Sequence, residues 1–247
     1  MKKFENLGII VLATTEQITL KETIKALLNN CSENDISEIL ILLASADCPS
    51  ACSANEIVKN NTSTIPISCH IQKNPGLYFA VFEAPHLISK CSHFLIIGSD
   101  LEMDPHSVPE MIEMSKKNPN MIVCASKFMK CSQREDYGKI HYLCNRTVNY
   151  IIGKILHVKA TEIISTFQIY PVDIFQEMNF TNEEKAYYEY TLRPLAMGKD
   201  YIEISTNYSK RYEGKSTFTP KKYILGSLTF FRIAYSERKR AKKIVKQ

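Results

Sequence analysis

Short apolar runs alternate along this chain with segments in which apolar residues recur every three or four positions. Continuous apolar runs are typical of strands buried on both faces of a parallel sheet, and the second pattern is typical of helices with one buried face. The runs that predict strands are 7–12, 39–43, 65–71, 94–97, 121–125, 167–170 and 201–205. The segments that predict helices are 18–29, the region around 54–58, 77–90, 108–117, 137–157 (one helix or a helix pair) and 183–197. This alternation predicts an α/β fold with a mostly parallel central sheet flanked by helices.

The size and composition of the chain agree with a single globular domain. It has 247 residues, of which 45% are hydrophobic and 23% are charged, a composition too ordinary for a disordered or fibrous protein. We assign residues 1–220 to one α/β domain and residues 221–247 to a C-terminal tail, because the charge of the chain changes between them.

The basic character of the protein resides in that tail. Residues 221–247 carry nine Lys or Arg and one Glu, a charge of +8, which leaves −3 for the first 220 residues out of a total of +5. Aromatic and aliphatic residues precede most of these cations, so we expect an amphipathic helix that lies on an anionic membrane surface. The alternative is a terminal helix packed on the domain with a solvated basic end. The acidic domain has no recognisable nucleic-acid motif, which argues against nucleic-acid binding.

The cysteines and the apolar stretches indicate where the protein resides. The eight cysteines include no Cys-x-x-Cys pair, which argues against a zinc site and leaves free thiols in a reducing cytosol as the expected state. No apolar stretch approaches the roughly 20 residues that span a bilayer, and the first apolar run is too short for a signal peptide. We therefore expect a cytoplasmic protein, attached peripherally to the inner face of a membrane through its tail.

Candidate chemistry concentrates in residues 96–105. Asp100, Glu102 and Asp104 follow the strand predicted at 94–97 and precede a helix, and open α/β sheets bind their ligands at the carboxyl ends of strands. Three carboxylates within five residues repel one another unless a cation lies among them, and a hard divalent ion suits oxygen ligands. The alternative is that Asp100 and Asp104 are turn and helix-capping residues.

The stretch Ile-Ile-Gly-Ser-Asp-Leu-Glu-Met-Asp-Pro at 96–105 resembles the metal-binding segment of inverting family-2 glycosyltransferases, typically Asp-Ala-Asp-Leu-Gln-His-Asp-Pro. The pattern is most similar to that of the polyprenyl-phosphate sugar synthases. The resemblance implies a GT-A-like (Rossmann-like) fold, a nucleotide-diphosphate sugar donor, and Mn²⁺ or Mg²⁺ held by Asp100 and Glu102. Gly98 stands where the first Asp of the family's motif belongs, so we expect weaker binding of the ion or of the ribose.

Further short matches occur in the family's order over residues 7–216. Thr14-Thr15-Glu16 lies where such enzymes carry Tyr-Asn-Glu, Ser45-Ala46-Asp47 lies where they carry Ser-x-Asp, and Asn74-Pro75-Gly76-Leu77 resembles their Asn-x-Gly-Leu turn. The paired carboxylates that usually contact the base and ribose are Leu42 and Leu43 here. By this resemblance, the residues expected to bind the nucleotide sugar are Thr14, Glu16, Ser45, Asp47, Gly76, Ser99 and Asp100.

The resemblance also implies two catalytic residues, Glu189 and Arg211. The segment from Glu189 to Gly198 resembles the helix that carries the family's acidic catalytic residue, and the segment 210–216 resembles the synthases' Asp-Arg-x-x-Gly-Glu-Ser. Glu189 is the candidate general base for a hydroxyl acceptor, whereas an ionised lipid phosphate needs none. Arg211 suits bidentate phosphate contacts. The alternatives are a solvated glutamate for Glu189 and, for Arg211, a surface salt bridge with Glu213 or a neighbour.

The sequence therefore predicts a glycosyltransferase that moves a sugar from a nucleotide-diphosphate donor to a lipid-phosphate or glycan acceptor with metal assistance. A rival interpretation is a catalytically degenerate binding or scaffold protein of the same fold, which Gly98 and Leu42-Leu43 favour. A third is a transferase that builds glycan on hydroxyl acceptors and depends absolutely on Glu189. Residues that could supply additional cationic contacts to the acceptor are Lys127, Arg134 and Arg146.

Overall fold

The computed structural model describes residues 3–88, 90–135, 137–180, 185–213 and 220–244, the last range without the side chains of 220–222. The strands are β1 (Leu7–Ala13), β2 (Ile36–Leu43), β3 (Ile67–Ile71), β4 (His93–Gly98), β5 (Ile122–Ser126), β6 (Gln168–Pro171) and β7 (Tyr201–Ser205). The helices are α1 (Ile18–Asn30), α2 (Ser50–Lys59), α3 (Leu77–Leu87), the 3₁₀ turn η1 (Pro105–Ser107), α4 (Val108–Lys117), α5 (Lys139–Leu156), α6 (Val172–Met178), α7 (Ala186–Ala196) and α8 (Pro220–Ile244).

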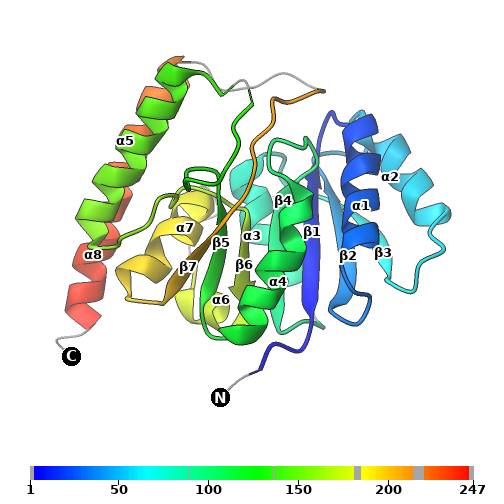
Figure 1. Cartoon of the computed structure of the whole chain (residues 1–247), viewed down its shortest axis with the longest axis horizontal. Coiled ribbons are helices and arrows are strands. Elements are labelled where there is room, and N and C mark those ends of the chain that lie inside the picture. Colours follow the sequence, from blue (N-terminus) through cyan, green and yellow to red (C-terminus); the bar gives the residue numbers. More distant parts are fainter. Residues whose placement is uncertain (1–2, 89, 136, 181–184, 214–219, 245–247) are drawn as a thin grey trace.

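One seven-stranded sheet organises the molecule, with strand order β3-β2-β1-β4-β6-β5-β7. Helices α1, α2 and α4 pack on one face, and α3, α6 and α7 pack on the other. Helices α5 and α8 lie together at one end of the sheet, over α7 (Figure 1). β6 is antiparallel to both of its neighbours, and every other pairing is parallel. The predicted α/β architecture with a mostly parallel sheet is confirmed.

The apolar runs are continuous because the sheet is covered on both faces. In β2, Leu40 and Leu42 pack beneath α3, whereas Ile39, Ile41 and Leu43 pack beneath α1 and α2. Successive side chains of a strand point to opposite faces, so a strand covered on both sides needs an apolar residue at every position. Leu42 and Leu43 are therefore core residues.

Most predicted elements occur, and the differences have local causes. Every predicted strand is present, with ends that differ by no more than three residues, and 137–157 contains a single helix. Helix α3 ends at Leu87, two residues after an internal Pro85, rather than at residue 90. Helix α6 was not predicted, because its seven residues are too few to establish a helical period.

The C-terminal segment forms the 25-residue helix α8, which packs on the domain. Phe230 and Ala234 are buried against Val148 and Ile152 of α5 and Leu192 of α7. On its inner side, the tail is therefore a terminal helix packed on the domain, which was the alternative prediction. No helix in the described part of the chain is both long and apolar enough to cross a membrane. The division of the chain at residue 220 stays a prediction.

Candidate active site

The carboxyl ends of β2, β1 and β4 meet at one edge of the sheet. Leu12 pairs with Gly98, and Ala13 pairs with Leu43, in parallel register. The segments that follow the three strands, 14–16, 44–47 and 99–104, therefore begin side by side at the edge where open α/β sheets bind ligands.

Glu16 is a buried carboxylate that connects two of these strand ends. Its Oε2 accepts hydrogen bonds from the backbone N–H groups of Thr14 and Thr15, both at 2.8 Å. The Ser99 hydroxyl donates to the Leu12 carbonyl at 2.8 Å and lies 3.5 Å from the same Glu16 oxygen. Burial opposes ionisation of Glu16, but the backbone N–H groups outweigh it and lower the pKa. Glu16 is thus a fixed negative charge. The side chain of Thr14, also expected to bind the nucleotide sugar, is exposed.

Asp100 and Glu102 converge on the guanidinium of Arg211. Arg211 Nη2 lies 2.7 Å from Asp100 Oδ2, and Arg211 Nε lies 3.3 Å from Glu102 Oε1. Leu101 between the two acids has a left-handed backbone with φ of 57°, and the Glu102 N–H donates to Asp100 Oδ1 at 3.1 Å. A non-glycine residue in this conformation is strained, and such strain clusters at functional sites.

These two carboxyl groups are half-buried, and their surroundings raise their pKa values. Burial raises the pKa of Asp100, and burial followed by the charge of Asp100 raises the pKa of Glu102, while Arg211 opposes both shifts. Two partly desolvated carboxyl groups that lie close together are both ionised readily only when a positive charge lies near them. In this structure that charge belongs to Arg211.

Arg211 belongs to a segment, residues 207–213, that crosses the same edge of the sheet. In Figure 1 this segment, drawn in orange, runs from β7 toward α1. The Ser209 N–H donates to the Glu102 carbonyl at 3.1 Å. At its far end, Glu213 Oε2 accepts from the N–H groups of Gln17, Ile18 and Thr19 at 2.8 to 2.9 Å.

The contact of Glu213 replaces a missing helix cap. Helix α1 has no side-chain N-cap of its own, because Gln17 occupies that position without a capping hydrogen bond. A carboxylate satisfies the free N–H groups and suits the positive end of the helix dipole. Sequence reasoning missed this role, since the partners lie 194 to 196 residues apart. The alternative for Arg211 was a surface salt bridge with Glu213 or a neighbour, and the structure pairs Arg211 with Asp100 and Glu102 instead of Glu213.

Asp104 has the capping role that was its alternative interpretation. It is the N-cap of η1, and its Oδ1 accepts from the His106 N–H at 3.0 Å and pairs with His106 Nδ1 at 2.8 Å. Its carboxylate is therefore engaged away from Asp100 and Glu102.

Asp100 and Glu102 supply two carboxylates to the divalent-ion site that the family resemblance implies. In the described residues, no group of three or more His, Cys, Asp or Glu side chains could hold a metal. Magnesium is commonly bound through only one or two carboxylates, with substrate phosphates and water filling the other positions. Two hard oxygen donors that already attract a guanidinium fit this type of site, with a bound diphosphate supplying the remaining ligands.

The other residues expected to bind the nucleotide sugar lie along the same edge without joining the acidic pair. Ser45 is half-buried and Asp47 is exposed after β2, and a hydrogen bond from Ser45 lowers the pKa of Asp47. Gly76 has φ of 128° and begins α3, and its N–H donates to Gln72 Oε1 at 3.1 Å. Within the described chain, no hydrogen bond or ion pair connects these three residues to Asp100 or Glu102.

Glu189 lies in a buried ionic network instead of in the cluster around Asp100. Its Oε1 is 2.7 Å from Nη2 of Arg193, whose Nε and Nη2 also donate to the two carboxylate oxygens of Glu237 in α8, both at 3.0 Å. Glu189 Oε2 is buried and has no hydrogen-bond partner among the described residues. The alternative of a solvated glutamate is wrong, because Glu189 is only 6% exposed. Its role as a base stays a prediction.

Gly98 offers a direct test of the missing carboxylate. Its φ is not among the positive values of the chain, and an added Cβ would meet Asp100 Oδ1 at 3.2 Å, at the end of a side chain that can shift. We expect Gly98→Asp to fold and to bind Mn²⁺ at least about tenfold more tightly in calorimetric titrations with UDP present, because site affinity rises with ligand charge. Gly98→Asn is the matched uncharged control. Equal affinities for the two variants would contradict the assignment of this edge as the metal site.

Comparison with known proteins agrees with this architecture. No protein-family model matches the chain. Glucosyl-3-phosphoglycerate synthase from Mycobacterium tuberculosis, in complex with Mn²⁺, uridine-diphosphate-glucose and phosphoglyceric acid, superposes with a TM-score of 0.66 at 11% identity, over 94% of this chain and 80% of that chain. The same enzyme with Mg²⁺ and uridine-diphosphate gives a TM-score of 0.64 at 12% identity, over 91% and 78%. A mycobacterial protein gives 0.65 at 10% identity, over 94% and 74%. At such identities the likeness establishes the fold, which is that of GT-A-like glycosyltransferases.

Proposed function

We propose that this protein is an inverting glycosyltransferase of family-2 type that uses a nucleotide-diphosphate sugar and a divalent ion. The observation that carries the proposal is the half-buried pair of Asp100 and Glu102, which converge on one cation at the carboxyl end of β4. The similar enzyme binds Mn²⁺ and uridine-diphosphate-glucose, and its fold is the one found here. Together these findings support a donor site along the edge formed by β2, β1 and β4.

The residues of this chain have distinct tasks in the proposed reaction. An acceptor oxygen forms a bond to the anomeric carbon of the sugar as the bond from that carbon to the diphosphate oxygen breaks, and the diphosphate leaves with the electron pair. A divalent ion held by Asp100 and Glu102 would neutralise the charge that develops on the diphosphate. Arg211, beside these carboxylates, supplies a second fixed cation. A hydroxyl acceptor would pass its proton to Glu189, and an ionised phosphate would need no base.

A cavity next to this pair supports an acceptor that carries a phosphate. The cavity is a shallow depression, open to solvent, with a volume of about 260 Å³, and it is lined by Arg134, Tyr137, Gly138, Lys139 and Tyr142. Among the described residues, no ion pair includes Arg134 or Lys139, and we propose that these two cations face an anion. Arg134 Nη1 donates to the Lys127 carbonyl at 2.8 Å, and the guanidinium lies over the Tyr142 ring.

Tyr208 connects this cavity to the acidic pair. Its ring centroid lies 4.5 Å from that of Tyr137, and its backbone forms bridges with Met103 and Arg134. Burial and, next, the charge of Glu102 raise the pKa of Tyr208 to about 12. The anion-binding cavity and the proposed ion site are therefore close neighbours, as donor and acceptor sites must be. The similar enzyme binds phosphoglyceric acid, and for this chain we propose a lipid-phosphate acceptor or, as the second candidate, a glycan.

Lys139 tests the acceptor cavity with a matched control on the same helix. It begins α5 and is exposed, and Lys154 is an exposed cation near the other end of α5, over the Tyr150 ring. We expect Lys139→Gln to raise the KM for a phosphate acceptor about tenfold, about 1.4 kcal/mol, and to leave the KM for the donor unchanged. Lys154→Gln should change neither constant. Equal effects of the two variants would remove the cavity from acceptor binding.

The rival interpretation is a non-catalytic binding or scaffold protein that kept the fold and lost the nucleotide site, since Leu42 and Leu43 occupy core positions. Melting temperatures with UDP or GDP and Mn²⁺ test binding, because a ligand of the native state raises the melting temperature. A panel of nucleotide sugars with Mn²⁺, first without acceptor and then with 3-phosphoglycerate or a short-chain polyprenyl phosphate, tests turnover. Stabilisation by a nucleotide together with hydrolysis or transfer supports the transferase. No stabilisation by any nucleotide would favour the degenerate protein and contradict the transferase.

The setting that we propose for this reaction is the cytoplasmic face of a membrane, to which the protein attaches peripherally. The predicted amphipathic tail supports it, since the charge of +8 in residues 221–247 suits an anionic surface.

A further inference from the structure

Exposed apolar side chains gather on one part of the molecule. Thirteen large apolar side chains are exposed in the described chain, and nine of them belong to the helix pair α5 and α8. These nine are Ile140, Leu143, Tyr150, Ile151, Ile224, Leu225, Leu228, Tyr235 and Ile244. Single exposed apolar residues are ordinary on a protein surface, but a concentration on two adjacent helices marks an interaction site.

The outer side of α5 carries an apolar stripe that the described part of the chain leaves exposed. Ile140, Leu143, Tyr150 and Ile151 recur at the spacing of one helix face, with exposures from 37% to 81%. The opposite side, which includes Val148, Ile152 and Leu156, is buried against α7 and α8. An apolar stripe left open to water on the other side of such a helix favours a partner that covers it.

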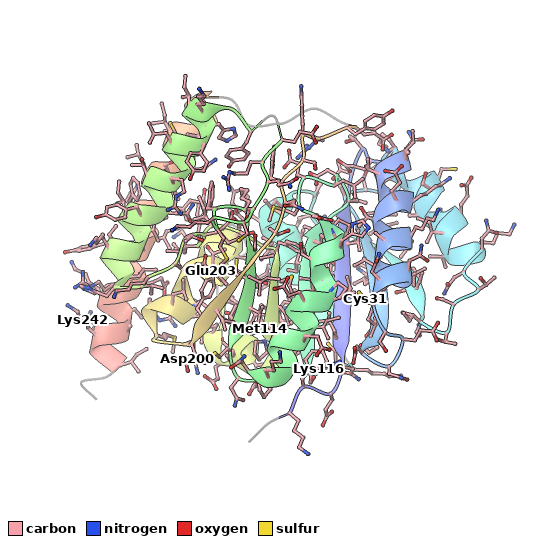
Figure 2. All side chains as sticks on the ribbon, viewed as in Figure 1. Cys31, Met114, Lys116, Asp200, Glu203 and Lys242 are labelled. Carbon is pink, nitrogen blue, oxygen red and sulfur yellow. The ribbon has the colours of Figure 1, made fainter. Side chains whose placement is uncertain are left out.

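The outer side of α8 changes along its length from apolar to basic. Ile224, Leu225 and Leu228 come first and are 52% to 60% exposed. Exposed cations follow, and they are Arg232, Lys239, Arg240, Lys242 and Lys243. Figure 2 shows Lys242 near the end of α8, at the outer edge of the molecule. Lys239 lies over the Tyr235 ring, with its Nζ 4.6 Å from the ring centroid. The apolar and basic parts of the outer side of α8 are therefore continuous.

Acidic side chains are absent from the exposed surface of this pair. Helix α5 contains no Asp or Glu, and the single acid of α8 is Glu237, which is buried and paired with Arg193. The described exposed charges of α5 and α8 are therefore all positive. This surface complements an anionic partner, and it repels a second copy of itself.

We propose that the outer surface of α5 and α8 together is the membrane-docking face of this protein, and that its partner is an anionic lipid surface. The inference goes beyond attachment through the tail alone, because four of the nine exposed apolar side chains belong to α5, a helix inside the domain. Apolar side chains enter the interface between headgroups and acyl chains while the cations bind the headgroups. Nucleic acid would use the cations and leave the apolar stripes exposed.

Docking through α5 would also orient the proposed acceptor cavity. Gly138 and Lys139, which line that cavity, begin the helix whose outer side meets the lipid. A phosphate on a lipid would thus enter the cavity from the surface on which the protein lies. This consequence rests on the proposed function, whereas the docking face itself does not.

The apolar part is tested by flotation of the full chain with vesicles of phosphatidylcholine containing phosphatidylglycerol. We expect recovery with these vesicles and at least about a fivefold lower recovery for Tyr150→Gln/Ile151→Gln on α5 and for Ile224→Gln/Leu228→Gln on α8. The control is Ile18→Gln/Ile71→Gln, on α1 and β3, whose side chains are 53% and 47% exposed. Tyr150 and Ile151 are chosen because they lie away from the cavity.

The charged part is tested in the same assay. Lys239→Gln/Lys242→Gln/Lys243→Gln should lose recovery at low salt, and Lys25→Gln/Lys59→Gln/Lys73→Gln, which removes three exposed cations elsewhere, should not. Recovery of the parent chain should fall as salt is raised, because exposed charges are screened.

Several outcomes would overturn the proposal. Unchanged recovery of the α5 variant would leave the tail as the sole anchor, and equal losses for test and control variants would indicate non-specific adsorption. Concentration-dependent dimers in light scattering that the same apolar variants abolish, without vesicle recovery of the parent, would assign the face to self-association. Melting temperatures of all variants within a few degrees of the parent exclude unfolding. Affinity for UDP with Mn²⁺, measured on the same samples, reports separately on the proposed function.

Discussion

Asp100→Ala is expected to reduce Mn²⁺-dependent binding of a nucleotide sugar at least about a hundredfold, about 2.8 kcal/mol. The variant removes one of two carboxylates that face the same cation, which is Arg211 Nη2 at 2.7 Å in this structure. The remaining acid, Glu102, lies 3.3 Å from Arg211 Nε and would hold an ion alone. Isothermal titration with UDP-glucose and other nucleotide sugars, with and without Mn²⁺, measures the loss.

Asp104→Ala is the matched control for this prediction. Asp104 belongs to the same turn, but its carboxylate caps η1 through the His106 N–H, so its loss should cost a modest part of the stability, about 1 kcal/mol, and little affinity. Asp100→Ala should keep the fold, because the residue follows the end of a strand and lies outside the apolar core. If Asp104→Ala lost the affinity and Asp100→Ala kept it, the ion site would be wrongly assigned.

Glu189→Gln is expected to lower kcat at least about a hundredfold with a hydroxyl acceptor, on the scale of general-base contributions. With an ionised phosphate acceptor, kcat should change little, because no proton needs to be removed. Glutamine keeps the shape of the side chain. In the parent, Glu189 is buried beside Arg193, and its Oε2 has no hydrogen-bond partner in the described structure. Single-turnover rates with each acceptor type measure the difference.

Glu237→Gln separates this catalytic role from a structural one. Glu189 and Glu237 both pair with Arg193 and are each 6% exposed, so each variant removes one of two carboxylates from the same buried guanidinium. We expect both variants to lower the melting temperature by a similar amount, since breaking a buried pair is destabilising. Only Glu189→Gln should slow a hydroxyl reaction. Equal kcat values for the two variants would assign Glu189 to the connection between α7 and α8.

The order and type of the elements were readable from the sequence because each reflects a local pattern. The run from Phe94 to Ile97 identifies β4 as a strand covered on both faces, and the polar residues after it place Asp100 and Glu102 at a strand end. Helix α6 was missed because two turns carry too little periodicity. The antiparallel insertion of β6 between β4 and β5 was also unreadable, because strand order depends on pairing between distant segments.

By itself, the sequence determined the α/β fold, the acidic turn after β4 and the charge of the tail, because runs, spacings and local charge are properties of neighbouring residues. Only the tertiary structure decided which charges meet. It joined Arg211 to Asp100 and Glu102, and Glu213 to the start of α1. Ion pairs form wherever folding brings side chains within about 4 Å, and chain separations of more than a hundred residues leave no local signal of that approach.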